Sequence, residues 1–305
     1  MNLRPALRNL AAAVAAWAAL GAVLAVTEPA PDPVRLGLYE WMGTAAIVVA
    51  ADVIADDGKF VVAVTRSSIK GTIPPGTTLY VDLRNANRDR PVGVRPLDLS
   101  KGHAYLFLLK ASRRGAKAPQ PVFDLVRDLG GARELPPEGA DAVVDAATRL
   151  GQIQERRSDD VLWASIPDFL EDPNPVLVDA SLELVVKFRR ESVGMIPVLA
   201  PLLESPRPDV RQRAVVVVGR LLARPGSESV PERGALVGEI TGRARRDDDP
   251  LVRRAAVAAL AVLRDSGIDE TLRAVSHDDP DQDVRFEAEK ALFERKESAE
   301  VRRSD

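Results

Sequence analysis

One helical phrase recurs in the C-terminal half of the chain and constrains its fold more than any other feature. The copies begin at Pro208, Pro250 and Pro280, and each has a Val-Arg pair, an Ala four residues after that Val, and a Val or Leu four residues later. Residues four apart lie on one face of a helix, so each copy carries an apolar stripe with a small residue at its centre. A helical phrase that is repeated about every 30–45 residues is typical of an α-solenoid.

The register of this stripe can be followed through four copies, of which the first is the weakest. The first apolar position is taken by Val176, Val210, Val252 and Val284. The small position is taken by Ala180, Ala214, Ala256 and Ala288. The third position is taken by Leu184, Val218, Leu260 and Leu292. Because alanine allows a neighbouring helix to approach closely, we expect these stripes to form the core of the solenoid.

Further helices are expected between and before the copies. Apolar residues at helical spacing occupy 192–204 and 160–171, and 139–154 is interpreted as the first helix of a degenerate opening repeat. The expected architecture over residues 139–296 is an all-α solenoid of about four helix pairs plus a terminal helix. A charged tail follows at 297–305.

The repeated phrase resembles HEAT repeats, especially the short bacterial HEAT-like type that also occurs in phycobilisome lyases, over about residues 140–296. The copy at 173–184 departs from the pattern because Leu177 stands in place of the arginine. The resemblance implies that the arginines of the Val-Arg pairs make polar contacts between repeats, and these are Arg211, Arg253 and Arg285. It also implies a protein-binding role without identifying the partner, because HEAT arrays bind many unrelated proteins.

The amino terminus carries an export pattern. Arg4 and Arg8 precede an uncharged apolar run over residues 10–26. We expect residues 1–25 to be a secretory signal peptide, or the run itself to remain as a membrane tether with its positive end inside. A buried N-terminal helix is the alternative. After a linker at 26–37, the rest of the chain is expected to be periplasmic or extracellular, or anchored and facing outside the cytoplasm.

Residues 38–127 differ in character, because they contain short β-rich runs. These runs lie at 45–55, 59–65, 77–83, 104–109 and 121–126. An Asp-Asp-Gly turn joins the first two, which favours a hairpin. Five short strands in this length predict a small all-β, OB-like barrel, and a linker at 128–138 would join it to the solenoid.

The order of these strands resembles the netrin-like, or tissue-inhibitor-of-metalloproteinase-like, OB-fold domain. The matching residues are Val48 and Val53 in the first strand, Ile69 to Gly71 after the second, and Gly102 to Leu108. The animal inhibitors of this type insert an N-terminal cysteine into the metal site of a protease. This chain has no cysteine, so metalloprotease inhibition is not carried over, and disulfides are excluded.

Charge divides unevenly between the two regions. Basic residues outnumber acidic ones over 35–127, and acidic residues predominate over 128–305. The barrel and the solenoid could therefore attract each other or face different partners. Single-strand binding by an OB-like barrel needs aromatic side chains for base stacking, but Tyr105 and Phe107 fall in an apolar strand. No nucleic-acid partner is expected, since export would also separate the protein from nucleic acid.

No catalytic, cofactor or metal site is expected. The two histidines, His103 and His277, fall in different regions. The residues Ser276-His277-Asp278 are adjacent and cannot converge as a catalytic triad does. The acidic residues at 279–283 lack the glycine and glutamate of a calcium loop, so they and 247–249 are expected to cap helix starts.

These observations favour an exported, non-catalytic adaptor or scaffold that binds other proteins through the solenoid and the small barrel. The alternative is a regulator or inhibitor of an extracytoplasmic enzyme, acting through the netrin-like domain.

Overall fold

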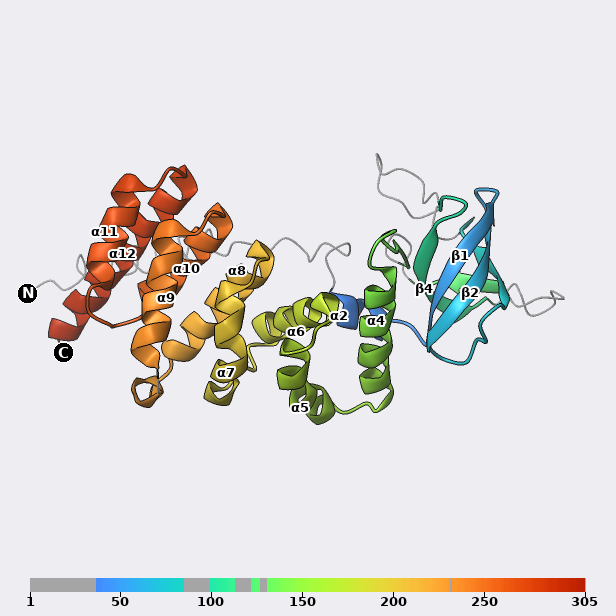
Figure 1. Ribbon diagram of the computed structural model, residues 1–305, viewed down its shortest axis with the longest axis horizontal. Helices are drawn as coiled ribbons and strands as arrows, with labels where there is room; N and C mark the ends of the chain where they lie inside the picture. Colours follow the sequence, from blue (N-terminus) through green and yellow to red (C-terminus); the bar gives the residue numbers. More distant parts are fainter. Residues whose placement is uncertain (1–36, 85–98, 113–121, 127–130, 231, 305) are drawn as a thin grey trace, which may run out of the picture. The chain divides into compact units, whose positions relative to one another are not determined.

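The structure, a computed structural model, describes residues 37–84, 99–112, 122–126, 131–230 and 232–304 (Figure 1). A β-barrel and an array of helices follow one another along this part of the chain. None of the helices in the described ranges is long and apolar enough to cross a membrane. The expected export segment lies outside the described residues.

Five strands close into a mixed barrel, and these are β1 (Ile47–Asp56), β2 (Phe60–Lys70), β3 (Thr78–Asp82), β4 (Ala104–Ala111) and β5 (Val122–Leu125). The strand order is β1-β2-β3-β5-β4, and β4 pairs again with β1 to complete the circle. Neighbours are antiparallel except β3 and β5, which are parallel. The predicted small barrel is therefore confirmed.

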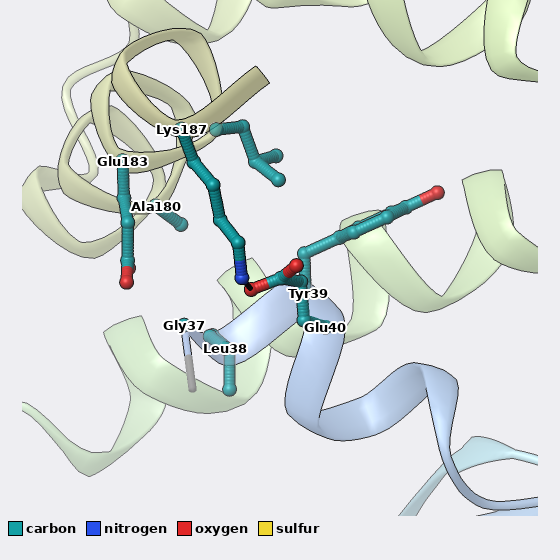
Figure 2. Close-up of a pocket in the computed structure, with 8 residues that line it drawn as sticks. Gly37, Leu38, Tyr39, Glu40, Ala180, Glu183 and Lys187 are labelled. Carbon is teal, nitrogen blue, oxygen red and sulfur yellow. Dashed lines mark hydrogen bonds and ion pairs between the residues drawn. The ribbon is translucent and has the colours of Figure 1, made fainter. Parts of the chain in front are cut away.

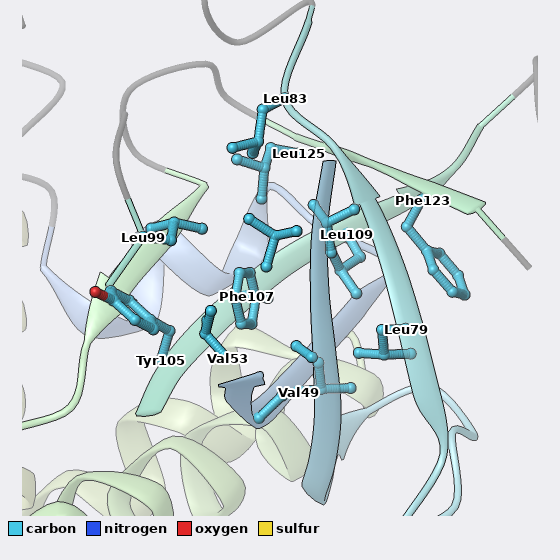
Figure 3. Close-up of a cluster of buried hydrophobic side chains, with 14 of the residues drawn as sticks. Val49, Val53, Leu79, Leu83, Leu99, Tyr105, Phe107, Leu109, Phe123 and Leu125 are labelled. Carbon is cyan, nitrogen blue, oxygen red and sulfur yellow. The ribbon is translucent and has the colours of Figure 1, made fainter. Parts of the chain in front are cut away.

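The barrel core follows from the apolar runs that predicted the strands. Val49, Leu79, Phe107 and Leu109 come from three different strands and are fully buried against one another (Figure 3). At the β1–β2 turn, Gly58 has a φ of 78°, a conformation that glycine adopts without steric cost. The Asp57 carboxylate accepts the Lys59 and Phe60 amides and holds the turn closed.

A sixth strand lies within the segment that was expected to be a linker. Strand β6 (Ala132–Glu134) pairs antiparallel with β4, beside β5 on the same edge. Three residues are too short for an alternating pattern to be recognised, and the neighbouring glycines and prolines indicated a loop. The barrel sheet therefore continues to within a few residues of the first helix of the array.

Within the described residues the array consists of nine α-helices: α4 (Ala140–Glu155), α5 (Asp159–Leu170), α6 (Pro175–Phe188), α7 (Ile196–Leu199), α8 (Pro208–Leu222), α9 (Arg233–Arg246), α10 (Pro250–Val262), α11 (Ile268–Asp278) and α12 (Gln282–Ser304). In chain order they make four pairs and a terminal helix, as predicted. Helix α7 has only four residues between the 3-10 turns η3 (Val193–Met195) and η4 (Ala200–Glu204). Pro197 and Pro201 lack the amides that a longer helix would need.

The predicted stripe is buried in the last three copies at its first two positions, where exposure does not exceed 3 %. Two stripe positions differ from the prediction. Val176 is only half-buried, and Leu177, which stands in place of the arginine, is fully buried next to it. Leu292 is also half-buried, since α12 is the last helix that the structure describes and only α10 and α11 cover it.

Helices α8 and α10 approach each other closely in the array. A Cβ built on Gly219 of α8 would lie 2.5 Å from the Cβ of Ala259 in α10. Carbon atoms cannot approach so closely, so any larger residue at 219 would push the two helices apart. Gly219 is therefore a packing residue, although glycine is intrinsically unfavourable inside a helix.

We expect Gly219→Ala to lower the free energy of unfolding by about 1–3 kcal/mol, because overpacking outweighs the gain in helix propensity. The matched control is Gly238→Ala in α9, where a Cβ would meet no atom within 4 Å. That change should raise stability by roughly 0.5–1 kcal/mol. Urea unfolding of both variants measures the difference, and a stabilised Gly219→Ala protein would contradict the packing described here.

A short helix before the barrel joins the barrel to the array. Helix α2 (Leu38–Gly43) buries Trp41 and Met42 completely and packs against α4. The guanidinium carbon of Arg133 in β6 lies 4.5 Å from the centre of the Trp41 ring. Helix α4 also touches β2 directly, because a Cβ on Gly151 would lie 3.2 Å from the Ile69 carbonyl oxygen. The barrel and the first helix therefore share a packed boundary.

Candidate protein-binding surface

A hollow between α2 and α6 is a tight packing joint with no room for a water molecule (Figure 2). Lys187 of α6 forms an ion pair with Glu40 of α2 across it. Glu183 is so close to the Gly37 backbone that a Cβ there would lie 2.5 Å from its Oε2. Burial, and then the nearby Glu40 carboxylate, raises the pKa of Glu183. The hollow is occupied by its own side chains and offers no ligand site.

An open cleft of about 710 Å³ lies between the barrel and the end of α4. Lys70 reaches across it and donates to the Met42 carbonyl oxygen at 3.5 Å and to the Gln154 Oε1 at 3.4 Å. Met42 is in the last turn of α2, where a cation is favourable because the helix carbonyls point outward. Lys70 thus has a structural role, and the cleft has no assembled chemical site.

The residues considered for catalysis are dispersed in the structure. His103 contacts Glu134 on the barrel, and both side chains are about half exposed. His277 contacts its neighbour Asp278 at 2.9 Å, and both are largely exposed. The Ser276 hydroxyl donates to the Arg273 carbonyl oxygen. Within the described part of the chain, no group of three or more acidic or histidine side chains is placed to hold a metal ion.

The arginines of the Val-Arg pairs form a buried ladder along the array. Arg211 of α8 donates to both carboxylate oxygens of Asp247, at 2.8 and 2.7 Å, and Asp247 lies in the turn before α10. Arg253 of α10 donates in the same way to Asp279, at 2.8 and 3.0 Å, in the turn before α12. Arg211 and Arg253 thus make inter-repeat contacts of the kind that the HEAT resemblance implied, whereas the contacts that the structure gives for Arg285 lie in its own turn.

Each ladder arginine also holds the turn before its own helix. Arg211 donates to the Ser205 carbonyl oxygen, Arg253 to that of Asp247 and Arg285 to that of Asp279. The turns are consequently linked in sequence from one repeat to the next. Because bidentate arginine–carboxylate contacts fix both distance and angle, the ladder sets the stacking register of the last three repeats.

Asp247 is the most enclosed carboxylate of the ladder, with a side chain that is 0 % exposed. Its Oδ1 also accepts the Asp249 amide, and Asp249 in turn caps α10 by accepting the Leu251 amide. Burial acts to raise the pKa of Asp247, but hydrogen bonds from Arg211 and the Asp249 amide outweigh it and hold this pKa below its usual value. The expected capping role of residues 247–249 is confirmed.

The ladder is interrupted between α6 and α8. Leu177 stands where the arginine would be, and Ser205 stands where the next turn would supply its aspartate. Both partners are thus replaced together, which avoids leaving one charge buried alone. A more exposed group of Arg207, Arg213 and Asp179 connects these two helices instead. Beside this interruption the surface of the array carries exposed apolar and basic side chains.

An aromatic–basic surface lies beside this interruption, and we define it by Trp163, Phe188, Arg189, Arg190 and Val193. The Trp163 and Phe188 rings meet edge to face with centroids 6.0 Å apart. Arg190 lies over the Trp163 ring at 5.5 Å. Phe188 is 47 % exposed and Val193 is 42 % exposed, so large apolar groups remain in contact with water. Tryptophan and arginine are the residues most enriched at the energetic centres of protein interfaces.

A buried carboxylate fixes the segment that carries part of this surface. Glu191 is 4 % exposed, and its Oε1 lies 3.2 Å from Arg220 Nε and 3.2 Å from Arg224 Nη2. Both arginines belong to α8 or the turn after it, so they tie the residues after α6 to the next repeat. These contacts hold the segment that contains Arg189 and Arg190 against α8.

The aromatic–basic surface was not found from the sequence. Trp163 is one of three tryptophans in the chain and occupies an expected helix, which was the available signal. Phe188 and the arginines after it follow the repeat stripe at the end of α6, where periodicity no longer identifies the buried face. Only the folded arrangement of α5 and α6 brings the two rings together.

Comparison with known proteins identifies part of the array. Residues 196–293, from α7 into α12, match the family model of HEAT repeats. No curated protein and no solved structure matches the chain. The matched segment is a HEAT-repeat region, a class of helical array that commonly mediates protein binding. The barrel has no family assignment, so its netrin-like resemblance stays a prediction.

Proposed function

We propose that the chain is an exported, non-catalytic adaptor that binds another protein on the surface of its helical array. The observation that carries the proposal is the HEAT-repeat region with its buried arginine–aspartate ladder. Recognition by a surface that is already rigid needs little ordering on binding, so more of the contact energy contributes to affinity. The export part of the proposal is supported by Arg4, Arg8 and the apolar run after them.

Exposed apolar side chains on the array support a binding role. Phe188 on α6 and Phe286 and Phe293 on α12 are each 47–65 % exposed. Exposure of such groups is costly in water, and burying one fully would contribute about 1.5–3 kcal/mol. On the barrel, Ile54 is 44 % exposed and lies next to the β1–β2 turn. A probe at this residue can therefore test the alternative role as an enzyme regulator.

Site-specific photo-crosslinking in cells tests the proposal. A photoreactive amino acid replaces Phe188 or Val262 on the array, or Ile54 on the barrel, in the full chain. We expect a discrete protein adduct from the array, and we expect it to disappear when residues 4–25 are deleted. An adduct formed only from position 54 would favour the alternative. Adducts that persist without residues 4–25 would place the binding inside the cell.

A further inference from the structure

Two arginines of the aromatic–basic surface, Arg189 and Arg190, form no ion pair with the residues that the structure describes. The arginines of α8 and the turn after it differ, since Arg220 and Arg224 are paired with Glu191. In the described ranges, no carboxylate lies within ion-pair distance of Arg189 or Arg190, and both are exposed. Among the described residues these two charges therefore have no carboxylate beside them, although acidic residues outnumber basic ones in this part of the chain.

The backbone of Arg189 has a conformation that is unusual for a residue other than glycine. Arg189 ends α6 with a φ of 51°, in the left-handed region. Glycine is the residue that normally ends a helix in this conformation, because it has no Cβ to clash with the backbone. An arginine here stabilises the helix end less than glycine would. The position therefore carries a charged side chain where glycine would fit better, as Arg157 after α4 also does.

Arg189 and Arg190 lie beside apolar and aromatic side chains. Phe188 precedes the two arginines directly, and Arg190 covers the Trp163 ring at 5.5 Å. Val193 adds a second exposed apolar group three residues after Arg190. A ligand that fits this surface has a large apolar side chain against Phe188 and negative charges near Arg189 and Arg190.

We infer that the aromatic–basic surface binds an acidic segment of a partner protein, with an aromatic or large aliphatic residue flanked by aspartate or glutamate. The inference rests on the proposed adaptor function and specifies its partner. An anionic membrane would also attract the arginines. The exposed apolar groups that define the surface are only Phe188 and Val193, however, which is a small area for insertion into lipid. A protein segment suits the surface better.

Selection from a random peptide library on the purified full chain tests the inference. The wild-type protein should enrich peptides with Asp or Glu around an aromatic or aliphatic residue. The charge-reversed Arg189→Glu/Arg190→Glu variant should enrich Lys or Arg around the same kind of residue. The matched control, Arg264→Glu/Arg273→Glu, changes two exposed arginines elsewhere on the array and should keep the acidic preference.

A second variant separates binding from folding. Arg189→Gly should leave the melting temperature unchanged or higher, because glycine suits the left-handed conformation. Its affinity for a selected acidic peptide should fall roughly tenfold, and salt should weaken the wild-type complex more than the variant complex. Peptides without charge preference, or the same peptides from the wild-type and charge-reversed proteins, would overturn the inference. So would binding to phosphatidylglycerol vesicles in the absence of any acidic-peptide preference.

Failure of this inference can be told apart from failure of the adaptor function. If the peptide selection shows no acidic preference while array positions still crosslink to a protein in cells, the function stands and the assigned partner chemistry is wrong. If neither the selection nor the crosslinking detects a protein ligand on the array, both are wrong.

Discussion

Replacement of Asp247 by alanine should lower the free energy of unfolding by about 3–5 kcal/mol, because it leaves the buried Arg211 guanidinium without its carboxylate. The Arg211 side chain is 12 % exposed and the Asp247 side chain is 0 % exposed. The matched control is Asp248→Ala, since Asp248 is adjacent and exposed. That change should cost under about 0.5 kcal/mol. Equal urea midpoints for the two variants would show that the ladder does not hold the repeats together.

The same residue makes the array sensitive to acid. Since the folded-state pKa of Asp247 lies below its unfolded value of 3.8, its contribution to stability is fully present well above pH 3.8. It is lost progressively as the pH falls below that value and through the lower folded pKa. Asp247→Asn should therefore destabilise the protein near neutral pH, yet lose less stability than the wild type on acidification. A parallel decline of both proteins would contradict the role given to Asp247.

Replacement of Trp41 by alanine should also lower the free energy of unfolding by about 3–5 kcal/mol, because it removes a fully buried aromatic side chain. The loss should be concentrated where the barrel meets α4, and hydrogen exchange of α2 and α4 should rise more than that of α10. Trp163→Ala is the matched control, since this tryptophan is partly exposed, and its cost should be smaller. Unchanged exchange in α4 would mean that α2 does not join the two regions.

The repeat stripe and the strands could be predicted because their periodicity reports burial directly. Val210, Val252 and Val284 are buried as the spacing indicated. The arginine ladder was expected from the resemblance to HEAT repeats. Its aspartate partners, however, lie more than 20 residues away along the chain, in turns whose acidic residues were explained by helix capping alone.

Other features depend on contacts that a single sequence does not encode locally. Strand β6 is defined by its pairing with β4. Helix α2 is stabilised by burying Trp41 against Arg133 and α4. The replacement of an arginine by Leu177 was visible, but its consequence, a half-buried Val176 beside it, depends on how α6 rotates in the array. The aromatic–basic surface arises in the same way, from two helices and the segment after them.

We propose that the helical array binds a partner protein, and that it does so after export. Crosslinking from position 188 in intact cells tests it most directly, because the photoreactive group lies on the surface defined by Trp163, Phe188 and Arg190. We expect a discrete protein adduct from position 188 that is weakened by Arg190→Glu and lost on deletion of residues 4–25. Absence of any protein adduct from array positions, with the chain folded and present at its normal level, would contradict it.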